Sequence, residues 1–278
     1  MTAPTASATA PAPASPAPAK PQRKLNLRPA QGAIGVIVLV VILEVLSRTN
    51  IVPPTMLPPP SQVLSDLVSL LGSPEFLAHV GSTLVAWAIG LGLASVIGVT
   101  AGLILGSLRI VYEASRALIE FLRPIPAVAL VPLAILVFGQ GTQMKFMLVL
   151  YAALWPILLN TLYGAREIDP VTRETARTFR LSWWDTISRV YLPHTAPFAF
   201  TGIRISAAIA LIVTVSAELL AGTPMGLGSW ILSVQTGGGS TSQVFAGTIV
   251  AGVLGVLVNA ILKWVEGIIF AWRKEQHS

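Results

Sequence analysis

The sequence predicts an all-α membrane protein with six transmembrane helices, and three observations lead to this prediction. Of the 278 residues, 54% are hydrophobic and only 11% are charged, whereas soluble domains carry about 25% charged residues. The apolar residues gather in runs of about 20, the length that crosses the hydrocarbon core of a bilayer as a helix. The basic residues fall mostly between these runs, as they do in cytoplasmic loops.

Residues 1–28 precede the predicted transmembrane permease domain, residues 29–278. Apart from Met1 and Lys20, the first twenty residues are only Ala, Pro, Ser and Thr. This composition buries too little apolar surface to offset the entropy of ordering, so we predict a disordered cytoplasmic tail. The tail has no apolar stretch after a basic start, and therefore differs from a cleavable signal peptide.

The expected spans are the longest apolar runs: residues 31–47, 80–107, 115–138, 144–164, 197–221 and 243–271. With the N-terminus inside, the inner segments hold most of the Lys and Arg residues, and only Arg48 and Lys145 lie outside. This imbalance predicts an N-in, C-in topology, because positive loop charge stays in the cytoplasm. The net charge of +6 is spread over loops and forms no single patch, so we expect no nucleic-acid partner.

Small residues recur at every fourth position of the second expected span, and again in the last one. This spacing predicts close helix packing in lipid rather than a ligand site. The residues are Ala86, Gly90, Ala94, Gly98, Gly102 and Gly106, then Gly247, Ala251 and Gly255.

Two segments are expected on the outer side. After a run of prolines that ends the first span, Ser61 is expected to cap a short amphipathic helix that lies along the outer interface. The stretch from Gly222 to Ser242 is uncharged and rich in glycine, which favours a mobile or re-entrant loop.

Charged side chains within membrane spans are usually paired or functional. By their spacing, Glu120 is expected to pair with Arg123, and Lys263 with Glu266. Glu218 lies near the outer end of its span, where a polar group costs little, so it receives no substrate role.

The translocation path has candidates in three parts of the sequence. Two prolines interrupt the third expected span, and this kink is a candidate hinge or pore lining. An arginine two turns into the fifth span either snorkels inward, which we favour, or faces an anionic substrate. Two tryptophans are candidate cavity residues. The candidates are Arg123, Pro124, Pro126, Arg204, Trp87 and Trp155.

The inner loop from residue 165 to residue 196 is long and dense in charge. Asp169 followed by Pro170 predicts the start of a short helix that runs to about Phe179. Ser182 with Asp185 predicts a capping box and a second helix, which Leu192-Pro193 is expected to end. Two capped helices exceed what a connection needs, so the loop predicts a docking surface for a partner.

The loop resembles that of the membrane permeases of binding-protein-dependent ABC importers, where a Glu-Ala-Ala pattern is followed by Leu-Pro. The matching residues are Glu174-Thr175-Ala176 and Leu192-Pro193. Similarity to the nitrate, taurine and aliphatic sulfonate branch extends over Arg123-Pro124-Ile125-Pro126, Phe138-Gly139 and Pro156 to Thr161. The resemblance covers about residues 31 to 272.

The resemblance implies a type I importer in the inner membrane of a prokaryote. Two permeases, expected to be identical, pair, and each seats its loop on one of two copies of a separate ATPase. An extracytoplasmic solute-binding protein delivers the substrate, a small anion of the sulfonate, taurine or nitrate type. The residues implied in ATPase coupling are Glu174, Thr175, Ala176, Arg177, Phe179, Arg180, Ser182, Trp183, Trp184, Leu192 and Pro193.

Arg180 stands where the family usually has glycine. A side chain in left-handed backbone geometry costs about 1 kcal/mol. The turn between the two short helices is therefore expected to differ, or Arg180 is expected to contact the ATPase itself.

No pattern predicts catalysis, a metal site or a bound cofactor. The nearest approach to a phosphate-binding loop, Gly139 to Lys145, has Met144 where the second glycine must stand. ATP and magnesium are therefore expected only on the partner ATPase. The alternative from another class is an ion-coupled secondary transporter or channel without an ATPase, which would leave the long inner loop without a purpose.

Overall fold

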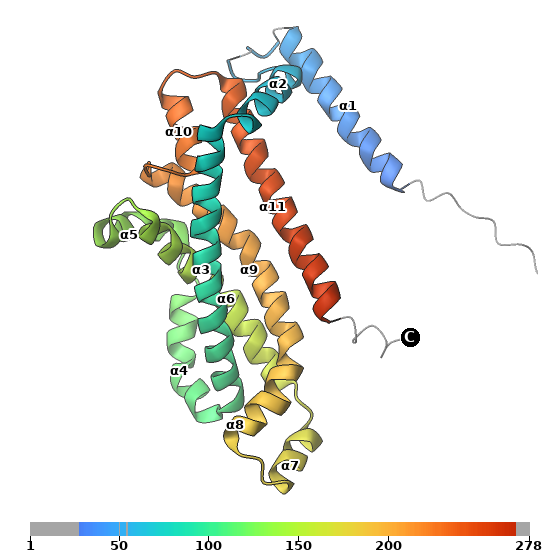
Figure 1. Ribbon diagram of the computed structural model, residues 1–278, viewed down its shortest axis with the longest axis vertical. Coiled ribbons are helices and arrows are strands. Elements are labelled where there is room, and N and C mark those ends of the chain that lie inside the picture. The colour runs from blue at the N-terminus through green and yellow to red at the C-terminus, as the bar shows by residue number, and fades with distance from the viewer. Residues whose placement is uncertain (1–27, 50, 54, 271–278) are drawn as a thin grey trace, which may run out of the picture. The chain divides into compact units, whose positions relative to one another are not determined.

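The computed structural model describes residues 28–49, 51–53 and 55–270, and every regular element in this part of the chain is a helix (Figure 1). The expected tail, residues 1–28, lies outside the described residues apart from the start of α1 (Arg28–Arg48). The chain divides into two compact units, one ending at Ile42 and the other beginning at Leu43. Within the described residues, the first unit consists of α1 up to Ile42.

The second unit contains the remaining elements. Helices α4, α7 and α8 lie at one end of it, called here the α7 end, and α2 and α10 lie at the other (Figure 1). The elements are α2 (Pro60–Leu71), α3 (Pro74–Ser107), α4 (Arg109–Leu122), η1 (Ala127–Leu130), α5 (Val131–Phe138), α6 (Thr142–Arg166), α7 (Pro170–Thr178), α8 (Trp183–Thr186), η2 (Ile187–Tyr191), α9 (Leu192–Ala221), α10 (Leu227–Thr236) and α11 (Thr241–Ile269).

Four helices of the described chain are long and apolar enough to cross a membrane: α3, α6, the continuous helix from Trp183 to Ala221 that includes α9, and α11. The bent pair of α4 with η1 and α5 makes a fifth if it is one span. The first expected span falls on α1, whose side chains are described only from Ile34 onward. The described residues thus hold four or five of the six expected spans.

The third expected span, 115–138, falls on α4, η1 and α5, and its two parts are separated at the prolines. Its two parts meet at a bend of 78°. Pro124 and Pro126 lack the amide protons that would continue the helical hydrogen bonds. The Tyr151 hydroxyl of α6 donates instead to the carbonyl oxygen of Leu122, at 2.6 Å. The proline interruption was correctly predicted, but the size of the bend was not.

The repeated small residues of α3 pack against α6, as predicted. A Cβ atom built on Gly90 would lie 2.5 Å from Val149 Cγ1, and one on Gly102 would lie 2.6 Å from Thr161 Cβ. Without side chains the two backbones approach closely and gain van der Waals contact along their length. This contact is part of a core cluster with Ala94 and Ile157.

Gly90→Ala is expected to lower the free energy of unfolding by about 1–3 kcal/mol, because a methyl group has no space there. The measurement is thermal unfolding of the purified chain in detergent. Gly92→Ala is the matched control, since a Cβ at Gly92 meets nothing within 4 Å and alanine favours a helix. Equal melting of the two variants would contradict the close packing of α3 on α6.

The outer stretch from Gly222 to Ser242 is more regular than expected. It contains α10, where Leu227 and Ile231 are buried in a cluster with Phe76 of α3 and Val250 of α11. The glycines serve the turn into this helix: Gly226 has φ of 151°, a conformation that side chains rarely adopt. The prediction of a mobile loop was wrong for residues 227–236.

The helix after the proline run also begins differently from the prediction. Ser61 is not the cap of α2, because Pro59 occupies that position and makes no side-chain bond there. The Ser61 hydroxyl donates to Glu44 Oε1 at 2.7 Å, and its amide donates to Glu44 Oε2 at 3.0 Å. Glu44 thus joins the end of α1 to the start of α2.

Candidate functional site

The loop at the α7 end forms the two short helices that the sequence predicts. The Asp169 carboxylate accepts the amide of Val171 at 3.0 Å and caps α7. Ser182 Oγ accepts the amide of Asp185 at 3.1 Å and lies 2.6 Å from its carboxylate. Both caps use amides that would otherwise have no partner at a helix start.

Leu192-Pro193 does not end the second helix, contrary to the prediction. The chain continues from α8 through the π-helical turn η2 directly into α9. The amide of Leu192 donates to Ile187, five residues back. A π turn is wider than an α turn, and this accommodates a proline that lacks its amide proton and crowds the carbonyl group four residues earlier.

The turn between α7 and α8 keeps the geometry for which a glycine is usual. Arg180 is the one non-glycine residue of the described chain with positive φ, at 49°. The Arg180 amide donates to Arg177 O at 2.9 Å, and the Leu181 amide donates to Ala176 O at 3.1 Å. This pair of bonds is the Schellman motif of helix ends. The expected difference in the turn is therefore absent.

Arg180→Gly is expected to raise the free energy of unfolding slightly, by no more than about 1 kcal/mol, because glycine adopts this geometry without strain. Arg180→Val is expected to lower it, since a branched side chain is least compatible with positive φ. Thermal unfolding in detergent measures both. A glycine variant that folds fully but no longer binds the ATPase would assign Arg180 to the contact instead.

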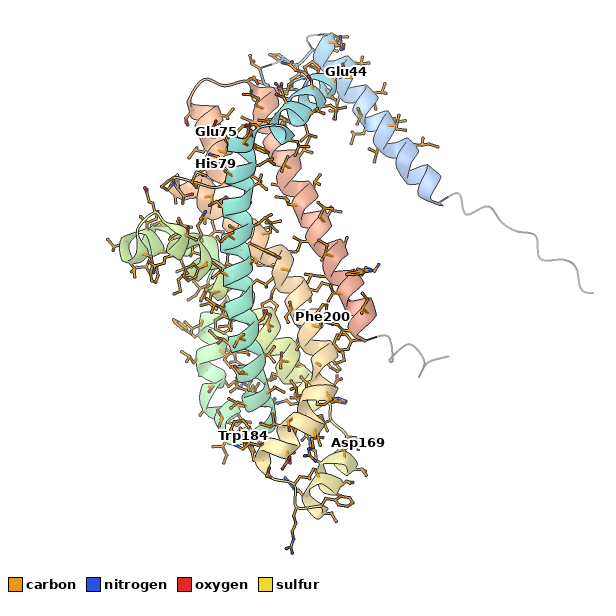
Figure 2. All side chains as sticks on the ribbon, in the orientation of Figure 1. Glu44, Glu75, His79, Asp169, Trp184 and Phe200 are labelled. Carbon is orange, nitrogen blue, oxygen red and sulfur yellow. The ribbon has the colours of Figure 1, made fainter. Side chains whose placement is uncertain are left out.

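The loop exposes aromatic side chains among its charged residues. Phe179 and Trp184 are 74% and 73% exposed, and the Trp183 and Trp184 rings meet edge to face with centroids 4.5 Å apart. Beside them is a groove of about 400 Å³ lined by Val171, Thr172, Thr175, Ala176, Phe179, Leu181 and Val190. Trp184 and Asp169 mark this end of the unit in Figure 2. Of the residues implied in coupling, all but Ala176 are exposed.

Arg173 turns back toward the bundle. Its Nη2 atom donates to the carbonyl oxygens of Ala165 and Arg166, both at 3.1 Å. These are among the last carbonyl groups of α6, which have no helical partner. Arg173 therefore holds α7 to the end of α6.

The charged candidates within the expected spans have other partners than predicted. Glu120 pairs with Arg116 at 2.8 Å, one turn away, and not with Arg123. The guanidinium of Arg123 makes no hydrogen bond or ion pair with any described residue. With Pro124, it lines a pocket between α4 and α6.

Arg204 is engaged by two side chains of α11. Its Nη1 lies 3.0 Å from Glu266 Oε2, and its Nε donates to Asn259 Oδ1 at 3.1 Å. The predicted pair of Lys263 with Glu266 is therefore wrong. Arg204 and Asn259 lie at a largely apolar groove of about 1070 Å³ between α9 and α11. A paired guanidinium has less to offer an anion, which weakens the substrate interpretation.

The two tryptophan candidates belong to the helix contacts of α3, α6 and α9. Trp87 Nε1 donates to the carbonyl oxygen of Ala207 at 2.9 Å, and the ring packs on a core cluster. The Trp155 ring meets Tyr151 edge to face, with centroids 5.8 Å apart. A role for either ring in the path stays a prediction.

The sequence did not reveal a buried ion pair near the α10 end. Lys145 Nζ of α6 lies 3.0 Å from Glu218 Oε1 of α9, and the two side chains are 2% and 0% exposed. Lys145 also donates to Ser82 Oγ and Met225 O, at 3.0 and 2.9 Å. Glu218 was expected to be an inexpensive polar end group, and the structure corrects this.

Further bonds tie this pair to the turn before α10. Glu218 accepts bonds from Thr83 Oγ1 at 2.9 Å and from the Gly228 amide at 3.0 Å. Thr83 Oγ1 in turn accepts the Leu227 amide at 2.8 Å. One signal was available: Lys145 is the fourth residue of α6 and Glu218 is the fourth from the end of α9. If these two helix ends lie on the same side of the membrane, Lys145 and Glu218 lie at the same depth in it.

Comparison with known proteins agrees with the loop geometry. Residues 94–270 match the family model of the binding-protein-dependent transport system inner membrane component. A permease of Bacillus subtilis assigned to aliphatic sulfonate transport is 31% identical, covering 85% of each chain. The nitrate import permease of Synechocystis is 26% identical (90% of this chain, 95% of that one), and the taurine transport system permease of Escherichia coli is 29% identical (86% and 88%).

Among solved structures, the methionine ABC transporter MetNI in an inward-facing conformation has a similar fold. The TM-score is 0.57 at 19% sequence identity, over 68% of this chain and 91% of the other. The match supports the helical permease architecture and carries no information on the solute.

The chain is a multi-pass transport component and not itself an enzyme. These relatives are named for aliphatic sulfonate, nitrate and taurine transport, and the family is that of binding-protein-dependent transport systems. With the family model matching most of its length, the chain belongs to the binding-protein-dependent ABC importer permeases of the inner membrane.

Proposed function

We propose that the chain carries a small oxyanion, of the sulfonate, taurine or nitrate type, through the inner membrane as a homodimer. Two copies of a separate ATPase seat on the α7 to α8 loops. ATP and magnesium bind to the ATPase and not to this chain. An extracytoplasmic solute-binding protein delivers the solute. Residues 1–28 are a cytoplasmic tail, and six spans, with α1 as the first, give an N-in, C-in topology.

The observation that carries the coupling role is the surface of the loop. Phe179 and Trp184 are exposed aromatic side chains on two capped helices, and buried aromatic residues commonly contribute most of the affinity of an interface. The Schellman turn and the Arg173 bonds to α6 fix these helices to the bundle. A movement of the ATPase is thereby transmitted directly into α6 and α9.

The names of the relatives support the choice of solute class. They transport nitrate, taurine and aliphatic sulfonates, each with a planar or tetrahedral group of anionic oxygens. An ion-coupled secondary transporter or channel would need no binding protein, so family membership favours the importer.

The test is uptake by cells that express this chain with a candidate ATPase and binding protein, using labelled taurine, an alkanesulfonate and nitrate. We expect uptake of one class that stops when ATP hydrolysis in the ATPase is abolished by mutation. Uptake that continues without the ATPase would refute the proposal. Subunit counting in nanodiscs tests the homodimer, and co-purification of two different permeases would contradict it.

A further inference from the structure

A pocket of about 480 Å³ lies between α4 and α6 at the α7 end, apart from the docking loop. It is lined by Tyr112, Arg116, Ile119, Glu120, Arg123, Pro124, Leu159, Leu162 and Tyr163. The bend after α4 helps to form it, because Pro124 ends the helix on which Arg116 and Glu120 lie.

The charges around the pocket are unequal. Arg116 is held by Glu120 at 2.8 Å, and Arg166, the last residue of α6, lies with its guanidinium carbon 3.7 Å from the centre of the Tyr112 ring. The guanidinium of Arg123 has no hydrogen-bond or ion-pair partner among the described residues, although its backbone amide donates to Ile119 O. The carboxylate of Glu113, three residues before Arg116 on α4, lies 3.8 Å from Arg109. The lining therefore holds two guanidinium groups and one carboxylate, and the carboxylate is paired with Arg116.

The geometry favours an anion with several oxygen atoms. Arg116 and Arg123 are seven residues apart, two helical turns, so both guanidinium groups project from the same side of α4. A guanidinium group presents paired N–H donors that match sulfonate, nitrate or phosphate oxygens. Leu159 and Leu162 of α6 complete the lining.

We infer that this pocket binds an oxyanion through the guanidinium of Arg123, beside the Arg116–Glu120 ion pair. The oxyanion is either the anionic group of the transported solute on the inner side of the membrane or the phosphate of an anionic phospholipid. The first source rests on the proposed function, and the second is independent of it. Basic pockets at the cytoplasmic ends of membrane helices suit either source.

The first measurement uses the purified full-length chain in nanodiscs of phosphatidylcholine, with radiolabelled sulfate as the probe and methanesulfonate and nitrate as competitors. The second measures phosphatidylglycerol retained by the chain in native mass spectrometry. Arg123→Gln is expected to weaken the binding of one of these probes by about tenfold or more, the usual effect of losing a charged hydrogen bond. Arg123→Lys keeps the charge but not the paired N–H donors, and its affinity for the probe is expected to be intermediate.

Arg109→Gln is the matched control, because it removes a guanidinium group from the same helix. The Arg109 side chain is 90% exposed and does not line the pocket. Sulfate binding that falls only in Arg123→Gln identifies the solute as the source, and loss of phosphatidylglycerol alone identifies the lipid. If neither probe distinguishes Arg123→Gln from Arg109→Gln, the inference is wrong. Neither measurement needs the ATPase or the binding protein, so failure of the uptake experiment would not change the result of these binding measurements.

Discussion

Replacing Lys145 with methionine is expected to lower the free energy of unfolding by about 3–5 kcal/mol, because it leaves one charge of a buried pair without its partner. The carboxylate of Glu218 would keep its bonds from Thr83 and Gly228. It would lose the Lys145 ammonium group, the one buried cation that contacts it among the described residues. Thermal unfolding of the purified chain in detergent measures the effect.

The double variant Lys145→Met with Glu218→Gln separates charge from packing. It is expected to recover most of the lost stability, since no uncompensated charge remains and the glutamine oxygen still accepts the Thr83 and Gly228 bonds. Arg109→Met is the control, an exposed ion pair whose loss changes stability little. Melting of Lys145→Met at the temperature of the unchanged chain would show that Glu218 is not held as a buried carboxylate.

Removing both exposed aromatic side chains of the loop, Phe179→Ala with Trp184→Ala, is expected to abolish coupling to the ATPase. Each aromatic residue at the centre of an interface contributes about 2 kcal/mol or more, so the pair would weaken ATPase binding by about a hundredfold or more. The two changes leave the folded chain intact, because both side chains are exposed in it. ATPase affinity in nanodiscs and solute uptake in cells measure the effect.

Ile110→Ala is the control for this experiment. Ile110 is 85% exposed at the start of α4, on the same end of the bundle but outside the loop, so its removal is expected to leave ATPase binding unchanged. If the double aromatic variant retains both ATPase affinity and uptake, the loop is not the docking surface.

The sequence predicted those features that neighbouring residues decide. Asp169 with Pro170 and Ser182 with Asp185 indicate helix starts because a side-chain oxygen reaches amides only two or three residues away. The small residues of α3 indicate close packing because every fourth residue lies on one helix face. The interruption after Arg123 was predictable because Pro124 and Pro126 lack the amide protons of helical hydrogen bonds.

The candidate site was predictable only in part. The positions of the loop residues followed from the caps, but the left-handed geometry at Arg180 was not predicted, because an arginine in place of glycine was expected to change the turn. The continuation of α8 into α9 through a π turn was not predicted either, because Pro193 is compatible with either a helix end or a wider turn. In the structure Tyr191, the last residue of the π turn, is buried in a cluster with Ala165 of α6.

By itself, the sequence determined that this is a helical membrane protein with a long capped loop, because composition, periodicity and capping act over a few residues. The resemblance of that loop to those of importer permeases indicated its family. Only the tertiary structure decided which charges meet. Lys145 joins Glu218 across 73 residues, and Arg204 joins Glu266 across 62. Lys263 is closer to Glu266 in the sequence but does not pair with it. The packing of α6, α9 and α11 sets the distances between charged groups, and electrostatic energy depends on that separation and on burial.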